Sequence, residues 1–516
     1  MRLPGALLPA LYVLLATSVV YQESEASGKI DARLKWALEA GGHSSKTAGA
    51  PPASPLGIFI EHLYPLPATG CAAAMGRSVR AGNSFISTAV ADPGCFAGLA
   101  SMPGVEGIYL SNRLKPLLDL SVPAARGREG ERIYGATGRG VIAGFVDLGL
   151  DTTHPDFRNP DGSTRLARLW DQTQEGRHPE GFSYGAECGP DEIESGECPE
   201  EDSGPYGGHG SHVAGIAAGS DAVYRGVAPE AMIIFVKARL EEANVVDAVS
   251  YIFNLAAAEN RPAVINISLG EHIWAHDGTS PFERALSALT GPGRIIVAAG
   301  GNEGSGMIHA GFDANSTLRA APFSVKNSDE ADIEFWLKGG LKYTAWVGVE
   351  EYNNGLPRFA ESPTVDVGMS SNVTLVSGNG LALGSVQIDF SDAASVVNGD
   401  SRLLARVRQS RAGAAWFLAV KCLDGPGRVD GWATTDNVNF TDASGTRGGI
   451  EFITGDNFET IAVPSTAKDI ISVAPYVTRD RWVDGDGNLY TGVSAPLGLT
   501  SRYAPAVPRA GRTSPD

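Results

Sequence analysis

The sequence has few cysteines and a shortage of basic residues, and each scarcity excludes a class of protein. Only 5 of the 516 residues are cysteine, too few for a small fold that depends on disulfide bonds. Lysine and arginine number 41 against 59 acidic residues, which gives a formal net charge of -18. A nucleic-acid-binding protein needs a basic face for phosphate contacts, so we expect no nucleic-acid partner. The acidic balance is typical of a soluble exported protein.

One long apolar run lies at the amino terminus, where residues 3–20 (LPGALLPALYVLLATSVV) follow Arg2. We interpret residues 1–26 as a secretory signal peptide cleaved after Ala26. An uncleaved membrane anchor is the alternative, because about 18 apolar residues are the lower limit for a span. The two internal prolines favour the signal peptide. We therefore expect no stable membrane span and a secreted, extracellular or periplasmic location.

The five cysteines fit an oxidising compartment without establishing one. Cys188 and Cys198 flank a short loop, and Cys71 and Cys95 lie in one amino-terminal segment, so two local disulfides are one interpretation. Cys422 would then be left over. Five free thiols are the alternative, and the sequence leaves both open.

Length and pattern together indicate about three domains, at roughly 150 residues each. Residues 27–55 are small, polar and proline-containing, and are interpreted as a linker. Residues 56–122 contain a β–α–β pattern that predicts a small α+β module. In residues 123–307, apolar strands such as VIAGFVD and MIIFVKA alternate with helical stretches. This pattern predicts an α/β fold with a doubly wound, mostly parallel sheet buried on both faces.

Residues 308–456 change to short segments that alternate apolar and polar positions, such as ADIEFWLKGG and SVQIDFSD. Glycine, asparagine and aspartate separate these segments, which predicts an inserted all-β sandwich or jelly roll. The α/β pattern returns in residues 457–516. An all-β block between two α/β pieces is best interpreted as an insertion into one domain.

Three polar residues follow or begin elements of the predicted parallel sheet. Asp147 ends an apolar strand, His209 begins a helix of small residues, and Asn302 lies in a glycine turn after another strand. Taken alone, the aspartate and the asparagine are more often turn residues. His209 and His212 lie three residues apart, but H-E-x-x-H is absent and no third ligand is apparent, so we predict no metal site there.

Taken together, in this order and spacing, these motifs resemble the subtilase (S8) family of serine peptidases, and most closely its Csp-type bacterial branch with a β insertion. The resemblance covers residues 138–304 and resumes at 460. It implies that Asp147 orients the imidazole, His209 is general base and then general acid, and Asn302 donates to the oxyanion. The substrate edge that it implies consists of Ser268, Leu269 and Gly270.

The same resemblance implies a serine-type endopeptidase that acts on polypeptides and requires no cofactor. It also implies that residues 56–122 are an inhibitory propeptide, a partner in cis. Asp156 matches a calcium ligand of the family, but the loop that completes that site is missing, so calcium binding is left without support.

The nucleophile is the main departure from the family pattern. Subtilases place it in a Gly-Thr-Ser-x-Ala segment that begins a helix. Here residues 278–280 (GTS) precede the oxyanion asparagine, and residues 492–496 (GVSAP) continue into proline-rich sequence unsuited to a helix. We therefore expect this chain to lack the catalytic serine and to be inactive as given. A C-terminally truncated protease and an inactive pseudoprotease or binding protein are both left open.

Overall fold

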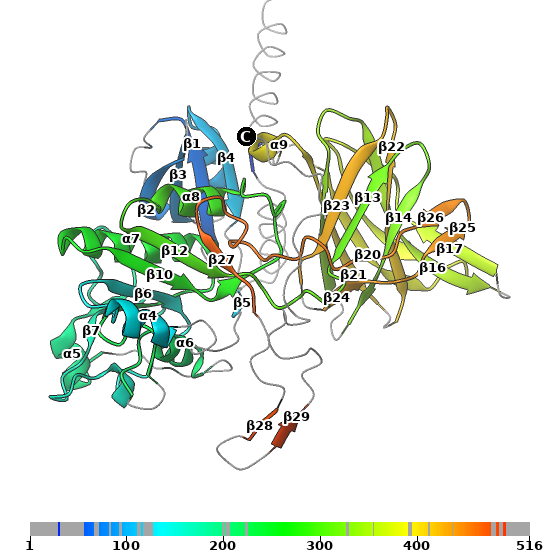
Figure 1. Ribbon diagram of the computed structural model, residues 1–516. Helices are drawn as coiled ribbons and strands as arrows, with labels where there is room; N and C mark the ends of the chain where they lie inside the picture. Colours follow the sequence, from blue (N-terminus) through cyan, green and yellow to red (C-terminus); the bar gives the residue numbers. More distant parts are fainter. Residues whose placement is uncertain are drawn as a thin grey trace, which may run out of the picture.

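The computed structural model describes residues 56–110, 115–116, 127–475, 481–483 and 489–491, apart from short internal gaps, together with Lys29 and Ile30. The predicted signal peptide and most of the predicted linker lie outside the described residues. Figure 1 shows three bodies, which we call the N-terminal sheet, the α/β unit and the β unit.

The N-terminal sheet has four strands in the order β2-β3-β1-β4, and all its pairings are antiparallel. Its elements are β1 (Leu56–His62), β2 (Ala72–Ala81), β3 (Ser84–Ala91), α3 (Phe96–Ala100) and β4 (Val105–Leu110). The predicted strands and short helix of this segment are confirmed. Strand β2 was missed, because AAAMGRSVRA has neither a clear apolar alternation nor β-branched residues before its valine.

The N-terminal sheet lies on two helices of the α/β unit, α7 (Glu242–Ala258) and α8 (Pro281–Leu289), as Figure 1 shows. Polar contacts fix this packing at both helices. The Thr88 hydroxyl donates to Asp247 Oδ1 of α7 at 2.7 Å. Arg284 Nη2 of α8 donates to Glu61 Oε1 of β1 at 2.5 Å.

The α/β unit contains a seven-stranded sheet in the order β27-β12-β10-β6-β9-β7-β8. Every pairing is parallel except that of β8 with β7, so the predicted doubly wound, mostly parallel sheet is confirmed. Its strands are β6 (Ile142–Asp147), β7 (Leu166–Asp171), β8 (Ala186–Cys188), β9 (Met232–Lys237), β10 (Ala263–Ile267), β12 (Arg294–Ala299) and β27 (Ile471–Val473). The other described elements before the β unit are β5 (Lys115–Pro116), α4 (Gly127–Tyr134), η2 (Pro155–Phe157), α5 (Pro190–Ser195), α6 (His209–Ala218) and β11 (Leu269–Gly270).

Helices cover the two faces of this sheet unequally. Ile142 and Val146 of β6 pack with α7, whereas Phe145 packs with Val213 of α6. On the β12 side of β6, the sheet face that α6 covers at β6 is exposed to solvent. Ile295 of β12, for example, is 41% exposed. On β27, the last strand at that edge, the apolar residues are half exposed, with Ile471 at 53% and Val473 at 51%.

The β unit consists of two sheets that share one core, with Phe335, Ile388 and Leu418 among its buried residues. One sheet has the order β13-β23-β15-β21-β20-β19, and the other has β17-β16-β22-β14-β26-β25, with β18 and β24 at its side. The pairings are antiparallel apart from that of β14 with β26. The predicted alternating segments form strands, since inward and outward residues alternate along a strand that is buried on one face.

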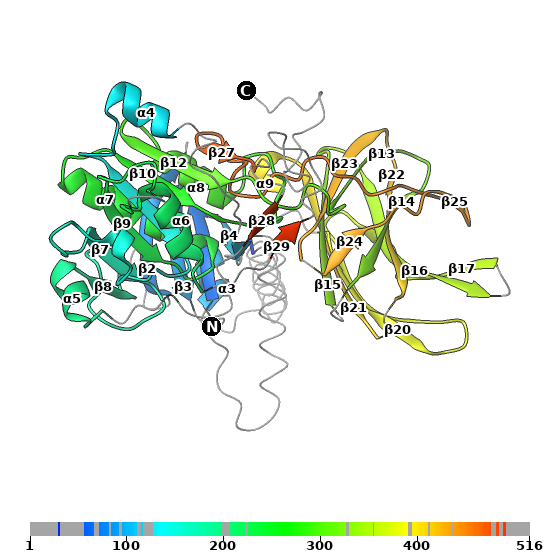
Figure 2. The same cartoon turned by 60° about the horizontal axis from the view of Figure 1, so that its bottom comes forward.

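The elements of the β unit follow one another in the sequence. They are β13 (His309–Ala314), β14 (Arg319–Val325), β15 (Glu330–Leu337), β16 (Tyr343–Asn353), β17 (Leu356–Glu361), β18 (Val365–Asp366), β19 (Ser370–Val376), β20 (Ala382–Asp389), α9 (Ser395–Asn398), β21 (Ser401–Gln409), β22 (Ala415–Cys422), β23 (Gly427–Ala433), β24 (Val438–Phe440), β25 (Gly445–Arg447) and β26 (Ile450–Phe452). Figure 2 shows the β unit beside the α/β unit. After β27, the described residues form only the small hairpin of β28 (Arg481–Val483) and β29 (Leu489–Thr491).

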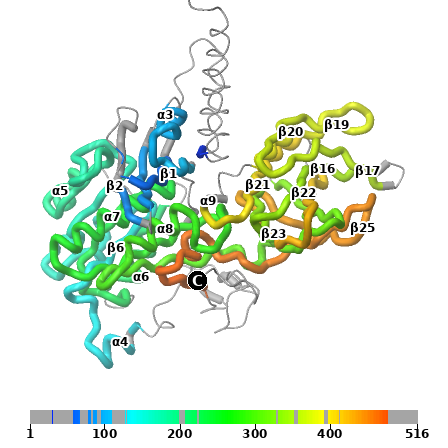
Figure 3. The backbone as a smooth tube through the Cα atoms, turned by 90° about the horizontal axis from the view of Figure 1, so that it is seen from above, coloured from blue at the N-terminus to red at the C-terminus, as the bar shows by residue number. Residues whose placement is uncertain are grey.

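A buried ion pair fastens the β unit to the α/β unit. Arg402 Nε of β21 donates to Glu334 Oε1 of β15 at 2.8 Å, and both side chains are almost fully buried. Glu334 Oε1 also accepts from Trp274 N of the α/β unit at 3.1 Å, and the Arg402 guanidinium lies 4.5 Å from the centroid of the Trp274 ring. Helix α9 lies at the same boundary (Figure 3), where Asn398 Nδ2 donates to Asp277 Oδ2 at 3.0 Å.

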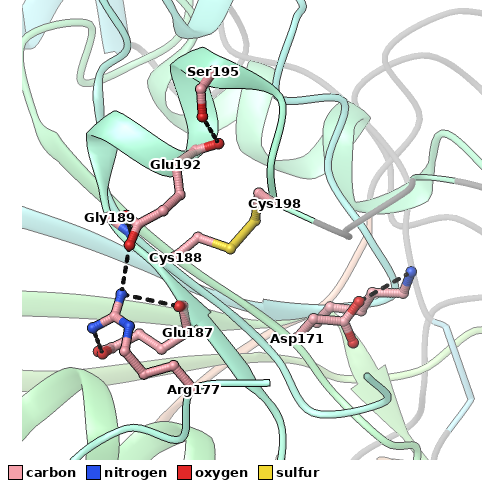
Figure 4. Close-up of a disulfide and its surroundings, with 9 residues drawn as sticks. Asp171, Arg177, Glu187, Cys188, Gly189, Glu192, Ser195 and Cys198 are labelled. Atoms are coloured by element: carbon pink, nitrogen blue, oxygen red, sulfur yellow. Dashed lines mark hydrogen bonds and ion pairs between the residues drawn. A yellow bond between two sulfur atoms is a disulfide. The ribbon is translucent and has the colours of Figure 1, made fainter. Parts of the chain in front are cut away.

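A disulfide joins Cys188 to Cys198, as one interpretation of the sequence had it (Figure 4). Cys422 is a buried free thiol. The other expected pair includes Cys71, which lies outside the described residues. Among the described residues, none of the helices combines the length and the apolar character needed to cross a membrane.

We predict that Asp247→Asn makes the free energy of unfolding less dependent on pH. Burial raises the pKa of Asp247 to about 6, so the folded state favours the neutral acid. In the wild-type chain this stability is complete below the unfolded pKa of about 3.9 and is lost as the pH rises through about 6. The amide does not ionise, so the variant avoids a loss on the order of 3 kcal/mol between pH 4 and 7.

Urea unfolding followed by circular dichroism at pH 4, 5, 6 and 7 measures the slope of the free energy of unfolding against pH for each chain. The exposed Asp313→Asn is the matched control and should keep the wild-type slope. Equal slopes for wild type and Asp247→Asn would show that the buried carboxyl group does not titrate in this range.

Candidate active site

The carboxyl ends of three neighbouring strands lie in one row. In the register of the sheet, Val146 of β6 pairs with Ile267 of β10, and Ile267 pairs with Ala298 of β12. Residues that follow these positions emerge at the same edge of the sheet, about 4.8 Å apart from strand to strand. Open parallel sheets form their sites at this edge. Asp147 and Ser268 come directly after the row, and the turn to Asn302 starts from it.

Asp147 and His209 form a short hydrogen bond. His209 Nδ1 lies 2.5 Å from Asp147 Oδ1, which also accepts from Leu148 N at 2.8 Å. Asp147 is fully buried, and burial raises its pKa above the usual value even though the bond to His209 opposes that change. Because the carboxylate accepts from Nδ1, that nitrogen carries the proton and Nε2 keeps its lone pair.

Glycines allow the histidine to approach the aspartate so closely. Gly208, immediately before α6, has φ +85°, a conformation that side chains disfavour. A Cβ on Gly210 would lie 2.1 Å from the Gly149 carbonyl oxygen and 3.2 Å from Asp147 Oδ1. The GGHGSH sequence therefore brings the first turn of α6 against the end of β6.

His209 Nε2 is buried, and no described residue gives it a hydrogen bond. A neutral imidazole that is oriented by a buried carboxylate on one nitrogen can accept a proton on the other. The arrangement can thus act as a general base toward a hydroxyl group that reaches Nε2.

Asn302 lies at a pocket and not in direct contact with the Asp147–His209 pair. The pocket encloses about 150 Å³ and is lined by Asn266, Ser268, the turn of residues 297–302 and residues 473–475. Asn302 N donates to Glu303 Oε2 at 2.7 Å, and Gly301 before it has φ +110°. This turn presents a carboxamide at the rim of a small cavity, where it can donate to an anionic oxygen.

Ser268, Leu269 and Gly270, the expected substrate edge, are close to this pocket. Ser268 lines it, with its hydroxyl 3.0 Å from Asn266 Oδ1. Leu269–Gly270 form β11, which pairs antiparallel with β5 (Lys115–Pro116). The edge therefore already pairs with backbone of the chain itself, from the segment that follows the N-terminal sheet.

Sequence reasoning missed the residues that hold the start of α6. Asp202 accepts from Gly208 N at 2.9 Å and from the Ser211 hydroxyl. Ser211 Oγ in turn accepts from Asp151 N at 2.7 Å, which joins α6 to the loop after Asp147. The signal in the sequence is a single acidic residue, Asp202, six residues before Gly208.

Comparisons with known proteins agree with this geometry. A profile of the Subtilase family matches residues 138–401, just over half of the chain. Serine protease AprX of Bacillus subtilis is 28% identical over 220 residues, 40% of this chain and 43% of that protein. Subtilisin-like protease 3 of Pseudogymnoascus destructans is 30% identical over 190 residues, 32% of this chain and 45% of that protein. The chain thus spans less than half the length of these relatives.

A solved structure, that of the Clostridium perfringens CspB protease, shares the fold with a TM-score of 0.59 and 18% identity. The match covers 76% of this chain and 78% of that one. The chain belongs to the subtilase family.

We predict that Asp147→Asn leaves the chain at least as stable as the wild type at pH 8. The variant removes a buried charge whose pKa is raised, while its Oδ1 can still accept from His209 and Leu148. Urea unfolding at pH 8 measures the change.

The matched control is Asp171→Asn, at the end of β7, which β9 separates from β6 in the sheet. Asp171 is also fully buried, but it lies 3.7 Å from Lys237 Nζ and accepts from Thr173 N at 2.8 Å. Its loss should cost about 1–3 kcal/mol, because it leaves a largely buried ammonium without this carboxylate. If both variants were equally destabilised, Asp147 would be a structural residue and not a functional one.

Proposed function

We propose that this chain carries the acid–base and oxyanion parts of a subtilisin-like serine endopeptidase centre that acts on polypeptides. The observation that carries the proposal is the 2.5 Å contact between Asp147 Oδ1 and His209 Nδ1. The other ring nitrogen, His209 Nε2, is buried and has no hydrogen-bond partner among the described residues. In this assignment Asp147 orients the imidazole, and His209 takes the proton of a serine and returns it to the leaving amine. Asn302 stabilises the oxyanion, a contribution of about 3–4 kcal/mol to the transition state.

We assign no nucleophile within the 516 residues. Ser280, in the sequence Gly-Thr-Ser, caps helix α8: its hydroxyl accepts from Glu283 N at 3.2 Å, and its own N–H donates to Glu283 Oε2. It therefore has a structural role as a helix cap. Ser494, the other candidate position, lies outside the described residues. The chain as given is expected to be inactive in hydrolysis.

The open face of the sheet supports a missing covering element. Apolar residues of β12 and β27 are 41–53% exposed on the side of α6, next to the pocket of Asn302. Exposed apolar surface of this kind is typical of an interaction site. A helix that begins with a serine and packs on this face would carry its hydroxyl toward the same edge as His209.

The proposal also assigns a role to each segment of the chain. Residues 56–122 act as an inhibitory propeptide in cis, supported by the packing of the N-terminal sheet on α7 and α8 and by the pairing of β5 with β11. Residues 123–307 and 457–516 form the peptidase domain, and residues 308–456 are a jelly-roll insertion. A leader at residues 1–26 exports the protein to an oxidising compartment, where the Cys188–Cys198 disulfide is stable. The acyl-transfer chemistry needs no cofactor, and calcium at Asp156 remains without support.

A pseudoprotease or binding protein is the second candidate. The pairing of β5 with β11 supports this candidate, because addition of an extended strand at this edge through backbone hydrogen bonds requires no serine. The two candidates differ in whether the gene encodes a Gly-Thr-Ser-x-Ala segment downstream of Asp516.

We predict that the 516-residue chain neither hydrolyses casein above the buffer rate nor reacts with a fluorophosphonate probe. A chain lengthened through a downstream-encoded Gly-Thr-Ser-x-Ala segment should hydrolyse casein and be labelled at that serine. His209→Ala in the longer chain should lower kcat/KM by a factor of about 10³ or more, because the triad residues act as a unit. Asn302→Ala should lower kcat about 10²–10³-fold.

The matched control is His178→Ala, which removes an exposed imidazole that contacts Gly185 O and should leave the rate unchanged. Hydrolysis by the 516-residue chain that survives His209→Ala would overturn the assignment of the centre. A stop codon directly after Asp516, with a stable exported product, would favour the binding protein.

A further inference from the structure

Four polar side chains gather where the β unit joins the α/β unit. His309 is the first residue of β13, Asp430 belongs to β23, and Asp456 and Glu459 lie on the segment that returns to the α/β unit. His309 is 1% exposed, Asp430 0% and Glu459 5%. The proposed peptide hydrolysis uses none of them.

Both ring nitrogens of His309 lie close to carboxylates of this cluster. Its Nδ1 lies 2.7 Å from Asp456 Oδ1. Its Nε2 lies 3.5 Å from Asp430 Oδ1 and 3.9 Å from Glu459 Oε2, yet it makes no hydrogen bond within the described part of the chain. The ligand-type atoms of His309, Asp430 and Glu459 all lie within 4.8 Å of one another.

This spacing suits a metal ion better than a direct contact. An ion bound at about 2.0–2.2 Å from nitrogen and oxygen ligands separates those ligands by roughly 3.0–3.6 Å. Side-chain rotations of the two carboxylates would close the remaining distance, since the ligand-type atoms all lie within 4.8 Å of one another. The bond from His309 Nδ1 to Asp456 reproduces the carboxylate–histidine–metal arrangement, which fixes the tautomer and aims the Nε2 lone pair at the ion.

The charges of the cluster also favour a dication. Asp430, Asp456 and Glu459 supply three negative charges, while Arg428, whose guanidinium bonds to Asp430 Oδ1, supplies one positive charge. A divalent ion beside a neutral His309 brings the sum to zero, whereas a proton on His309 leaves one negative charge in a buried site.

The backbone beside the cluster leaves room for these groups. Gly311 lies opposite Asp430 across the β13–β23 pair. A Cβ on Gly311 would lie 2.8 Å from His309 Cε1 and 2.9 Å from Asp430 Oδ1. A larger residue at this position would therefore displace the imidazole, the carboxylate or the nearby Arg428 guanidinium.

We propose that His309 Nε2, Asp430 and Glu459 bind one divalent first-row transition-metal ion such as Zn²⁺, with Asp456 positioning the imidazole. The imidazole ligand favours such ions over Ca²⁺ and Mg²⁺, which prefer all-oxygen sites. The ion ties β13 and β23 to the returning segment. Trp432 stacks on His276 of the α/β unit at 4.3 Å between ring centroids, and its ring lies 5.0 Å from the tilted ring of His309. The site therefore stabilises the junction of the two units.

The experiment uses the 516-residue chain without any affinity tag, stripped of metal with a chelator and then titrated with Zn²⁺ against a chromophoric competitor. The wild-type chain should bind one equivalent and unfold at a higher temperature with Zn²⁺ than without it. His309→Ala should lose this binding by at least 100-fold. Asp456→Asn should keep the stoichiometry but weaken affinity about 10–100-fold, as loss of a partner that orients a ligand does.

Two histidine controls locate the ion. His178→Ala removes an exposed imidazole, and His209→Ala removes the catalytic candidate, so both should still bind one equivalent. If His309→Ala does not fold, X-ray absorption of the wild-type chain loaded with Zn²⁺ decides: one imidazole with oxygen ligands supports the site. The proposal is overturned if the wild-type chain does not bind Zn²⁺ below about 10 µM, or if His309→Ala still binds it. A spectrum with sulfur ligands or with several imidazoles would also overturn it. Each of these readouts is independent of peptidase activity.

Discussion

The shared register of β6, β10 and β12 is the constraint on which the rest of the site depends. Because these strands are parallel and aligned at Val146, Ile267 and Ala298, the chain leaves the sheet three times at one edge. Asp147 reaches this edge directly, and α6 brings His209 to it through close contacts that glycine permits. The turn to Asn302 completes the row. A slip of one residue in any pairing would turn these side chains to the opposite face.

Much of the fold could be predicted, because the patterns that define it are local. The near-continuous apolar strand IAGFVD indicated burial on both faces, and the alternating segments after residue 308 indicated a sheet with one face in a core. Asp147 and His209 could be named as candidates because their motifs, in this order and spacing, resemble those of the subtilase family. Their contact, although 62 residues apart in sequence, follows from the parallel topology.

Other features could not be predicted, because they depend on tertiary contacts with no local pattern. Asp202 reaches the start of α6 from a loop that reads as a plain acidic run. The pairing of β5 with β11 joins two-residue segments that carry no periodicity. The cluster around His309 unites residues from three separate stretches, each of which looks like ordinary strand or turn sequence on its own. A search for motifs of fixed spacing in the sequence therefore finds sites on one helix or loop. It misses sites whose residues come from separate strands of a sheet.

The position of β27 has a consequence for how the chain is made. β27 (Ile471–Val473) pairs with β12 (Arg294–Ala299), although the whole β unit separates them in sequence. During synthesis the ribosome releases β12 long before β27, so the parallel sheet waits with one unfinished edge while the intervening sandwich emerges. Early collapse of that sandwich would shorten the distance between the two strands and reduce the entropy cost of closing so large a loop. Translation speed through residues 308–456 then becomes a determinant of how much chain reaches the native topology.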